Sequence, residues 1–237
     1  IVERWLDTTQ RRADADLRLL ARTIPAAALS KEAVSRYAKQ LDAELDLHLI
    51  NFPEVTGMRV FGADGELLYT SGRAAAPPAS GVDRRYFNFL RDNPQAEFVI
   101  SEVIRGRASG RKLIVFGRAL RGERGDFRGI VYAALDIDYF EQLFSALAVG
   151  DGGIVAIYRT DDFSRVARWP PVEGELSPKL PPDSPTRAAL AKGGKTSTLE
   201  ILSAADGVTR LYSYEVLDRY PFFVSVGIAR DDALAAW

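Results

Sequence analysis

The chain has 237 residues, of which 47% are hydrophobic and 27% charged, a composition that is ordinary for a globular protein. The Lys and Arg residues number 31 and the Asp and Glu residues 32, so the formal net charge of −1 provides no field that would attract nucleic acid. The absence of cysteine excludes disulfide bonds, thiolate nucleophiles and cysteine-based zinc sites. We therefore expect one large or two small globular domains without a nucleic-acid partner.

The first fifty residues have the apolar spacing of two helices. An apolar stripe at alternating steps of four and three predicts a long helix that Pro25 ends, about 35 Å in length at 1.5 Å per residue. The stripe consists of Val2, Leu6, Thr9, Ala13, Leu17, Leu20 and Ile24. A second helix is predicted from Ser30 onward. One of its faces carries Val34, Tyr37, Leu41, Leu45 and His48. We expect residues 1–50 to form a helical stalk or spine.

Beyond this region the pattern changes to that of strands joined by turns. A hairpin is predicted around residues 63–66, followed by a loop rich in Pro, Ala and Gly at 74–81 and a short helix with aromatic residues at 83–91. The expected strands are 56–61, 67–71, 97–104, 112–120 and 127–136. A short helix at 138–147 completes a module that we expect to span residues 51–147.

A smaller version of the same plan follows in residues 148–230. A long Pro-rich loop at 170–185 and a helical turn at 186–191 separate its strands, and a turn at 205–207 lies within the closing three-strand meander. The expected strands are 154–159, 165–169, 196–202, 209–216 and 222–228. The predicted fold class is α+β: a long N-terminal helix followed by two modules, each a mainly antiparallel sheet flanked by helices. Residues 231–237 have the pattern of the start of another helix.

The sequence contains few residues that could act as catalytic groups. His48 is the only histidine, and its place on an apolar helix face favours a structural role over that of a base or metal ligand. No zinc-helix motif and no strand-turn-helix serine motif is present, so we expect no catalytic residue, metal or cofactor. A carboxylate-only hydrolase remains an alternative, for which Glu102 and Asp136 are the pair to examine.

A basic segment lies between residues 102 and 128. It contains eight Lys or Arg residues and three acidic residues. Charge runs are usually solvated surface, but guanidinium groups also suit carboxylates at the mouth of a pocket, and the sequence leaves both interpretations open. Arg118 and Asp136 are charged residues in otherwise apolar strands, so each is expected to be paired structurally or aimed at a ligand cavity.

Several motifs, taken in order, resemble those of a double Cache domain, a tandem PAS-like sensor. In the first module these are DRRYF at 83–87, SGRK at 109–112 and FRGIVYAALD at 127–136. In the second module they are RLYSY at 210–214 and YPFFVSVG at 220–227. The resemblance implies a periplasmic input domain of a bacterial inner-membrane receptor, coupled to an output such as a GGDEF-type diguanylate cyclase or a histidine kinase.

The resemblance also implies where the ligand binds. In such families the ligand lies in the first, membrane-distal module, and Arg84 matches an arginine that grips a carboxylate. Asp136 matches the acid that receives an ammonium group in amino-acid sensors, but Tyr86 and Phe87 depart from the Trp-Tyr pattern of those sensors. A small organic acid is therefore our first hypothesis and an amino acid the second. The expected ligand-binding residues are Arg84, Tyr86, Lys112, Arg118, Tyr132 and Asp136.

The expected function is ligand sensing, with a helix shift that reaches a cytoplasmic effector. Trp5 and Trp237 lie near the two ends, and such tryptophans either adjoin the membrane boundary or simply pack within the domain. The resemblance implies flanking membrane spans, and we expect a homodimer in the receptor. An alternative is a ligand-free dimerisation or protein-docking module. In that case its own side chains would fill the cavity of the first module.

Overall fold

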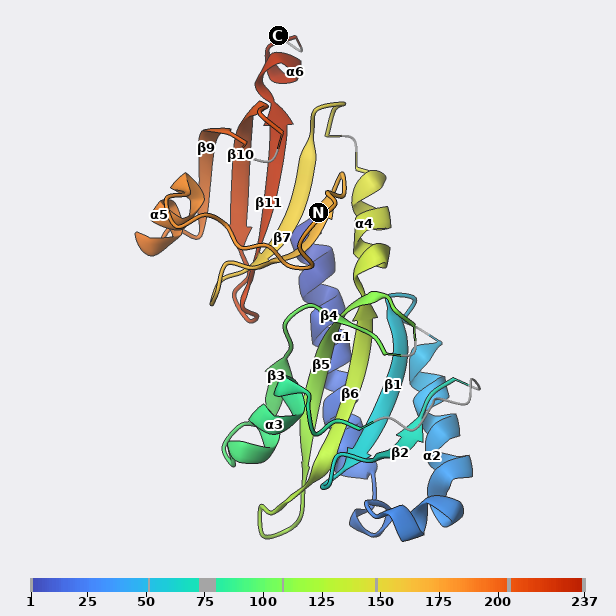
Figure 1. The fold of residues 1–237 in the computed structure, drawn as a ribbon. Helices are drawn as coiled ribbons and strands as arrows, with labels where there is room; N and C mark the ends of the chain where they lie inside the picture. Colours follow the sequence, from blue (N-terminus) through green and yellow to red (C-terminus); the bar gives the residue numbers. More distant parts are fainter. Residues whose placement is uncertain are drawn as a thin grey trace. The chain divides into compact units, whose positions relative to one another are not determined.

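A computed structural model describes residues 2–50, 52–72, 80–107, 109–147, 149–203 and 206–235 (Figure 1). The chain divides into two compact units. The first unit comprises Thr9–Asp136, and the second comprises Ile1–Thr8 together with Ile137–Trp237. Each unit is built on an antiparallel sheet with flanking helices, which confirms the predicted fold class.

The first helix, α1, spans Val2–Thr23. Every residue of its predicted apolar stripe is buried, which is why a segment with few other apolar residues forms one continuous helix. Trp5 lies within the second unit, where its ring stacks on Tyr139 at a centroid distance of 6.0 Å and meets Phe140 edge-on at 5.4 Å. Trp237 lies outside the described residues.

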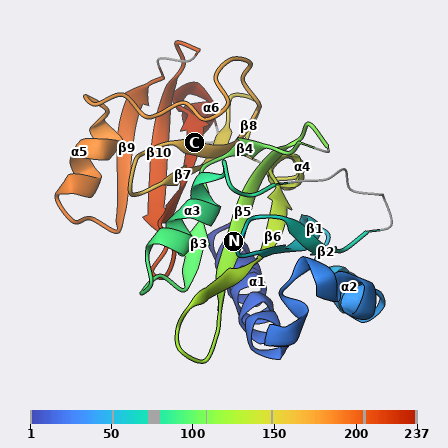
Figure 2. The same cartoon turned by 60° about the horizontal axis from the view of Figure 1, so that its bottom comes forward.

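The second helix, α2, spans Val34–Leu49 and follows short 3-10 helices at Ala26–Ala28 and Lys31–Ala33. A carboxylate of α2 binds the backbone at the edge of the sheet. Oδ1 of Asp42 accepts a hydrogen bond of 2.9 Å from the backbone N–H of Thr70. Nδ1 of His48 lies 3.0 Å from Oδ2 of Asp16 on α1, so this histidine has a structural partner. Figure 2 shows the two helices beside one another.

The sheet of the first unit has the strand order β2-β1-β6-β5-β3, and β4 also pairs with β5. Helix α3, Arg85–Asp92, contacts β5, β3 and β6 on one face of this sheet, and α1 lies on the other face (Figure 1). The strands are β1 Val55–Gly62, β2 Leu67–Thr70, β3 Phe98–Ile100, β4 Ile104–Arg105, β5 Lys112–Arg121 and β6 Phe127–Asp136.

One predicted strand, residues 97–104, is divided into β3 and β4. The division occurs at Ser101, whose hydroxyl Oγ accepts a hydrogen bond of 2.9 Å from the backbone N–H of Val115. The side chain of Ser101 thus takes the place of a backbone acceptor, and the chain leaves the ladder for residues 101–103. This local competition does not change the alternation of apolar residues, so the sequence pattern did not indicate it.

The sheet of the second unit has the order β8-β7-β11-β10-β9. Its three closing strands form the predicted meander, and α4 contacts β8. The elements are α4 Ile137–Ser145, β7 Ile154–Arg159, β8 Arg165–Trp169, α5 Pro185–Ala191, β9 Thr196–Leu202, β10 Thr209–Val216, β11 Phe222–Ala229 and α6 Arg230–Ala235. The predicted loop at 74–81 and the predicted turn at 205–207 lie partly outside the described residues.

Candidate functional site

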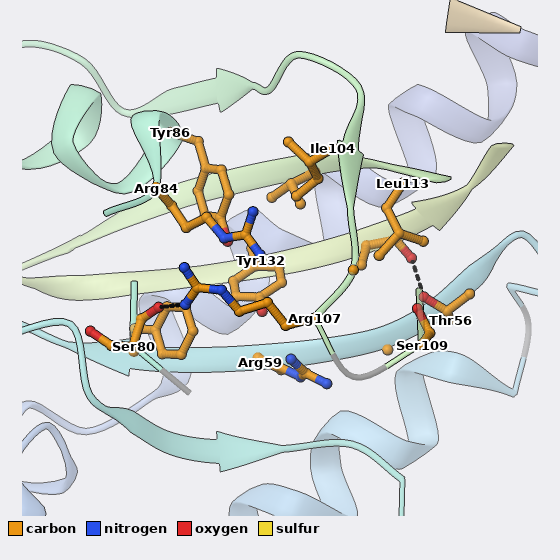
Figure 3. A pocket seen from close by; sticks show the side chains of 15 residues that line it. Thr56, Arg59, Ser80, Arg84, Tyr86, Ile104, Arg107, Ser109, Leu113 and Tyr132 are labelled. Carbon is orange, nitrogen blue, oxygen red and sulfur yellow. Dashed lines mark hydrogen bonds between the residues drawn. The ribbon is translucent and has the colours of Figure 1, made fainter. Parts of the chain in front are cut away.

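A cavity of about 120 Å³ lies on the α3 face of the first sheet (Figure 3). This is roughly four times the ~30 Å³ that a water molecule occupies in the liquid, so the cavity has room for a small molecule. Its apolar wall comes from β1, β5 and β6, at Phe61, Leu113, Val115 and Ala134. Its polar wall is formed mainly by arginine and tyrosine side chains.

Three guanidinium groups reach this cavity from three different segments: Arg59 from β1, Arg84 from the turn before α3, and Arg107 from the segment after β4 (Figure 3). Arg84 is the N-cap residue of α3 with extended backbone (φ −89°, ψ 126°), and its Nη2 makes one long hydrogen bond of 3.5 Å to the carbonyl of Arg105. Most of its donor capacity is therefore available to a ligand.

Arg107 has more partners than Arg84. Its Nη1 donates a hydrogen bond of 2.8 Å to the carbonyl of Ser80, and its Nη2 forms an ion pair with Asp83. Arg59 is half-buried and lies against the phenol of Tyr132. We therefore regard Arg84 and Arg59 as the guanidinium groups with the most capacity to bind an anion.

Two tyrosine phenols lie beside these guanidinium groups. Tyr86 and Tyr132 are 4% and 5% exposed, and their ring centroids are 5.7 Å apart. Burial raises the pKa of the Tyr86 phenol, and the adjacent Tyr132 raises it further. Burial also raises the pKa of Tyr132, against the opposing effect of Arg59. Both phenols thus remain protonated at neutral pH and can donate hydrogen bonds to an anion.

Of the described residues that line the cavity, none is acidic. Asp136 lies on the same face of the sheet as Tyr132, but it does not line the cavity, and its carboxylate forms an ion pair with Arg111. The wall therefore offers positive charge and hydrogen-bond donors, a combination that suits a carboxylate and gives an ammonium group no counter-charge.

Two expected ligand-binding residues, Lys112 and Arg118, do not reach this cavity. Leu113 and Val115 of β5 line the cavity, so alternation turns residues 112 and 118 to the opposite, α1 face. There Nε and Nη2 of Arg118 lie 2.9 and 2.7 Å from Oδ1 of Asp14 on α1. The sequence left open whether Arg118 is paired structurally or aimed at a ligand cavity. In the structure it forms an ion pair with Asp14. The cavity brings together only Arg84, Tyr86 and Tyr132 of the expected set.

Arg59 and Arg107 were not among the expected ligand-binding residues. Arg107 lies in the basic segment but had no feature that set it apart from its neighbours. Arg59 is flanked by Met58 and Val60, which are fully buried on the opposite face. A charged residue within an apolar strand is the signal that pointed to Arg118 and Asp136, and the same signal applied to β1 finds Arg59.

Comparison with known proteins identifies the fold. Residues 137–227 match the family dCache_1_like, described as a histidine kinase sensor domain. The extracellular domain of rpHK1S-Z16, named as a histidine kinase, is 24% identical with a TM-score of 0.75, and the match covers 98% of this chain and 92% of that one. The chain has the fold of a double Cache sensor domain.

Two further structures share the double Cache fold with this chain. The extracellular domain of soHK1S-Z6, also named as a histidine kinase, is 11% identical with a TM-score of 0.73, covering 100% of this chain and 92% of that one. The ligand-binding domain of the Campylobacter jejuni chemoreceptor Tlp3, in complex with 4-methylisoleucine, is 13% identical with a TM-score of 0.60, covering 98% and 86%. A search of curated proteins gave no match.

The structures that share this fold are named as extracellular or ligand-binding domains of histidine kinases and a chemoreceptor. Glu102, one of the two carboxylates considered for hydrolysis, does not line the cavity, and Asp136 is paired with Arg111. Among the described residues, no group of three or more His, Asp or Glu side chains could hold a metal ion. Nor does any helix in the described ranges combine the length and apolar character needed to cross a bilayer.

Proposed function

We propose that this double Cache domain is the periplasmic input domain of an inner-membrane receptor and that the first unit binds a small carboxylate. The observation that carries the proposal is the wall formed by Arg59, Arg84, Tyr86 and Tyr132, which offers cations and neutral donors without a lining carboxylate among the described residues. Charge-assisted hydrogen bonds from guanidinium groups are the strong polar contacts that a carboxylate can make.

The ligand class follows from charge and size. Tlp3, which shares the fold, was crystallised with 4-methylisoleucine, an amino acid. An amino acid would bring an ammonium group into a wall of three guanidinium groups, where like charges repel. A cavity of about 120 Å³ is also smaller than the roughly 300 Å³ at which ordinary ligand pockets begin. We therefore place short organic acids first and amino acids second.

The open cavity favours a ligand-binding domain over a ligand-free docking module. In a docking module the domain's own side chains would fill the space between α3 and the sheet, as they do in a close-packed core. Here the space remains, and polar groups with spare donors surround it. We further propose that the output of the receptor is a histidine kinase, since the matched family is described as a histidine kinase sensor domain. That the receptor is a homodimer stays a prediction from the sequence.

Signalling requires that the ligand bind one conformation more tightly than another. A physical connection runs from the cavity to α1 within the first unit. Tyr132 on β6 pairs in register with Gly117 on β5, and the next residue, Arg118, holds Asp14 of α1. We propose that closure of the cavity on its ligand shifts α1 by an ångström or two, a size of about that order being common for helix shifts.

The test is calorimetric titration of the purified chain with acetate, lactate and succinate, and with alanine and valine as the amino-acid arm. We expect at least one carboxylate without an ammonium group to bind, and to bind more tightly than either amino acid. At a ligand concentration of about 100 times Kd it should raise the free energy of unfolding by about 2.7 kcal/mol, which thermal unfolding would detect as a rise of several degrees in Tm. Binding of the amino acids alone would refute the ligand class.

A further inference from the structure

The second unit contains a larger cavity than the first. Its volume is about 470 Å³, within the range of roughly 300 to 1,000 Å³ that is ordinary for ligand pockets. The cavity lies between the sheet and the long segment that joins β8 to α5, which Figure 1 shows crossing in front of the strands. Residues 178–181 and 183–186 of this segment and of the start of α5 line the cavity opposite β7, β10 and β11.

A bulge in the pairing of β7 with β8 places two arginines on the wall of this cavity. Residues three apart on a regular strand point to opposite faces, so Arg165 and Arg168 should lie on opposite faces of β8. In the structure Ala156 pairs with Arg168 and Tyr158 with Arg165, with a register shift between them, and both arginines line the cavity. Bulges commonly redirect a side chain in this way beside functional sites.

The two arginines carry more positive charge than nearby carboxylates neutralise. No ion pair of Arg165 is found within the described part of the chain. Arg168 is 6% exposed and contacts the carbonyl of Pro170, while its Nη2 lies 3.5 Å from Oδ2 of Asp206. That carboxylate is already held by Arg210, whose Nη1 and Nη2 donate hydrogen bonds of 2.8 and 2.9 Å to it.

The titration behaviour of these groups reflects the same excess of cations. Burial lowers the pKa of Arg168, and the neighbouring charge of Arg165 lowers it further. Hydrogen bonds from Arg210 hold the pKa of Asp206 at about 2, so this carboxylate is ionised and its charge is shared between two arginines. An anion placed between Arg165 and Arg168 would relieve the repulsion between them.

The remaining charged groups at this cavity do not compensate for the arginine pair. Lys179 lines the cavity wall and is paired with Asp162, its Nζ lying 3.3 Å from Oδ2. Asp183 is the one acidic residue among the described residues that line the cavity, and it is exposed. The net charge presented to a ligand at the arginine pair is therefore positive.

Apolar and aromatic side chains line the wall beside the two arginines. Tyr158 stacks on Phe223 with ring centroids 5.3 Å apart, and Ile154, Ala156 and Leu180 extend the apolar surface. Burial raises the pKa of the Tyr158 phenol, which therefore remains a neutral hydrogen-bond donor. The cavity thus offers two guanidinium groups and, next to them, an apolar and aromatic surface, a combination that suits a ligand with an anionic group and a hydrocarbon or aromatic body.

We propose that the second unit has its own ligand site, which binds a carboxylate with a branched or aromatic apolar body. The carboxylate lies between the guanidinium groups of Arg165 and Arg168, and the apolar body packs against Phe223 and Leu180. This site is separate from the cavity of the first unit in residues, volume and the class of ligand it accepts. A receptor with both sites binds two different ligands, or one ligand with two different affinities.

The test uses the full chain carrying Arg84→Ala, which weakens the first cavity, with benzoate, 3-methylbutanoate and inorganic phosphate as probes in calorimetric titrations. We expect benzoate or 3-methylbutanoate to bind, and Arg165→Ala to weaken that binding about tenfold or more. Arg219→Ala removes an exposed arginine of the same unit that does not line the cavity, and it should leave the affinity unchanged.

A second measurement does not depend on the stability of the Arg165 variant. Crystals of the chain grown with 4-bromobenzoate should show an anomalous bromine peak against Phe223 and Leu180. Failure of both carboxylates to bind, binding of phosphate alone, or a bromine peak confined to the first unit would each overturn the proposal.

Discussion

Replacing Arg84 with alanine is expected to weaken binding of the small carboxylate to the first unit by about ten- to a hundredfold. Hydrogen bonds to charged groups contribute about 1.5 to 3 kcal/mol, and Arg84 is one of the two cavity guanidinium groups with the most capacity to bind an anion. Because Arg84 lies in the turn before α3 and makes only one long side-chain hydrogen bond, its loss should change the melting temperature little. Calorimetric titration of the variant and the unmodified chain with the same carboxylate measures the effect.

Arg85→Ala is the matched control for this prediction. Arg85 is adjacent in sequence, carries the same charge and is exposed, and it does not line the cavity. If its removal weakened binding as much as the removal of Arg84, the effect would arise from the general field of the basic surface. An unchanged affinity in Arg84→Ala itself would show that the carboxylate binds elsewhere.

The largest expected loss of stability comes from Asp14→Ala. The carboxylate of Asp14 holds Arg118 at 2.7 and 2.9 Å, and the side chains of Arg118 and Asp14 are only 9% and 17% exposed. Without Asp14, the buried guanidinium keeps one carboxylate, that of the exposed Glu97 at 3.5 Å, and a cation–π contact with Phe98 at 5.4 Å from the ring centroid. Removing one partner of a buried ion pair typically costs about 3 to 5 kcal/mol, so chemical denaturation should show a free energy of unfolding lower by about that amount.

Two variants separate this effect from a general loss of surface charge. Arg18→Ala removes the other cation near Asp14, but the side chain of Arg18 is 53% exposed, and such a pair is worth no more than about 1 kcal/mol. The double variant Asp14→Ala with Arg118→Met replaces the ion pair with apolar groups and should recover part of the loss. If Asp14→Ala cost no more than Arg18→Ala, the pair would not hold α1 against the sheet.

The sequence predicted the helices and strands well because each buried face has a regular period. The stripe of α1 corresponds directly to burial in the structure, and the apolar strands β5 and β6 are buried on both faces along most of their length. The sequence could not predict the division of the strand at Ser101, nor the bulge that turns Arg165 toward the same face as Arg168. The division of the strand depends on a single hydrogen bond, and the bulge depends on a one-residue shift in pairing. Neither changes the apolar pattern of the sequence appreciably.

The sequence predicted part of the candidate site, and it did so through a short motif. Arg84 and Tyr86 came from a resemblance in a short motif, and the cavity brings both of them together with Tyr132. Arg118 was ambiguous because a buried charge in a strand has the same appearance in sequence whether its partner is a ligand or a helix. Only the position of Asp14, 104 residues away in sequence, distinguishes the two.

The most direct test of the account is a crystal structure of the chain with the carboxylate that binds most tightly in the titration. We predict the carboxylate in the cavity of the first unit, with an oxygen about 2.7 to 2.9 Å from a guanidinium nitrogen of Arg84 and the other facing Arg59 or the two phenols. A ligand-free first cavity filled by the domain's own side chains, with Arg84 turned into solvent at saturating ligand, would contradict it.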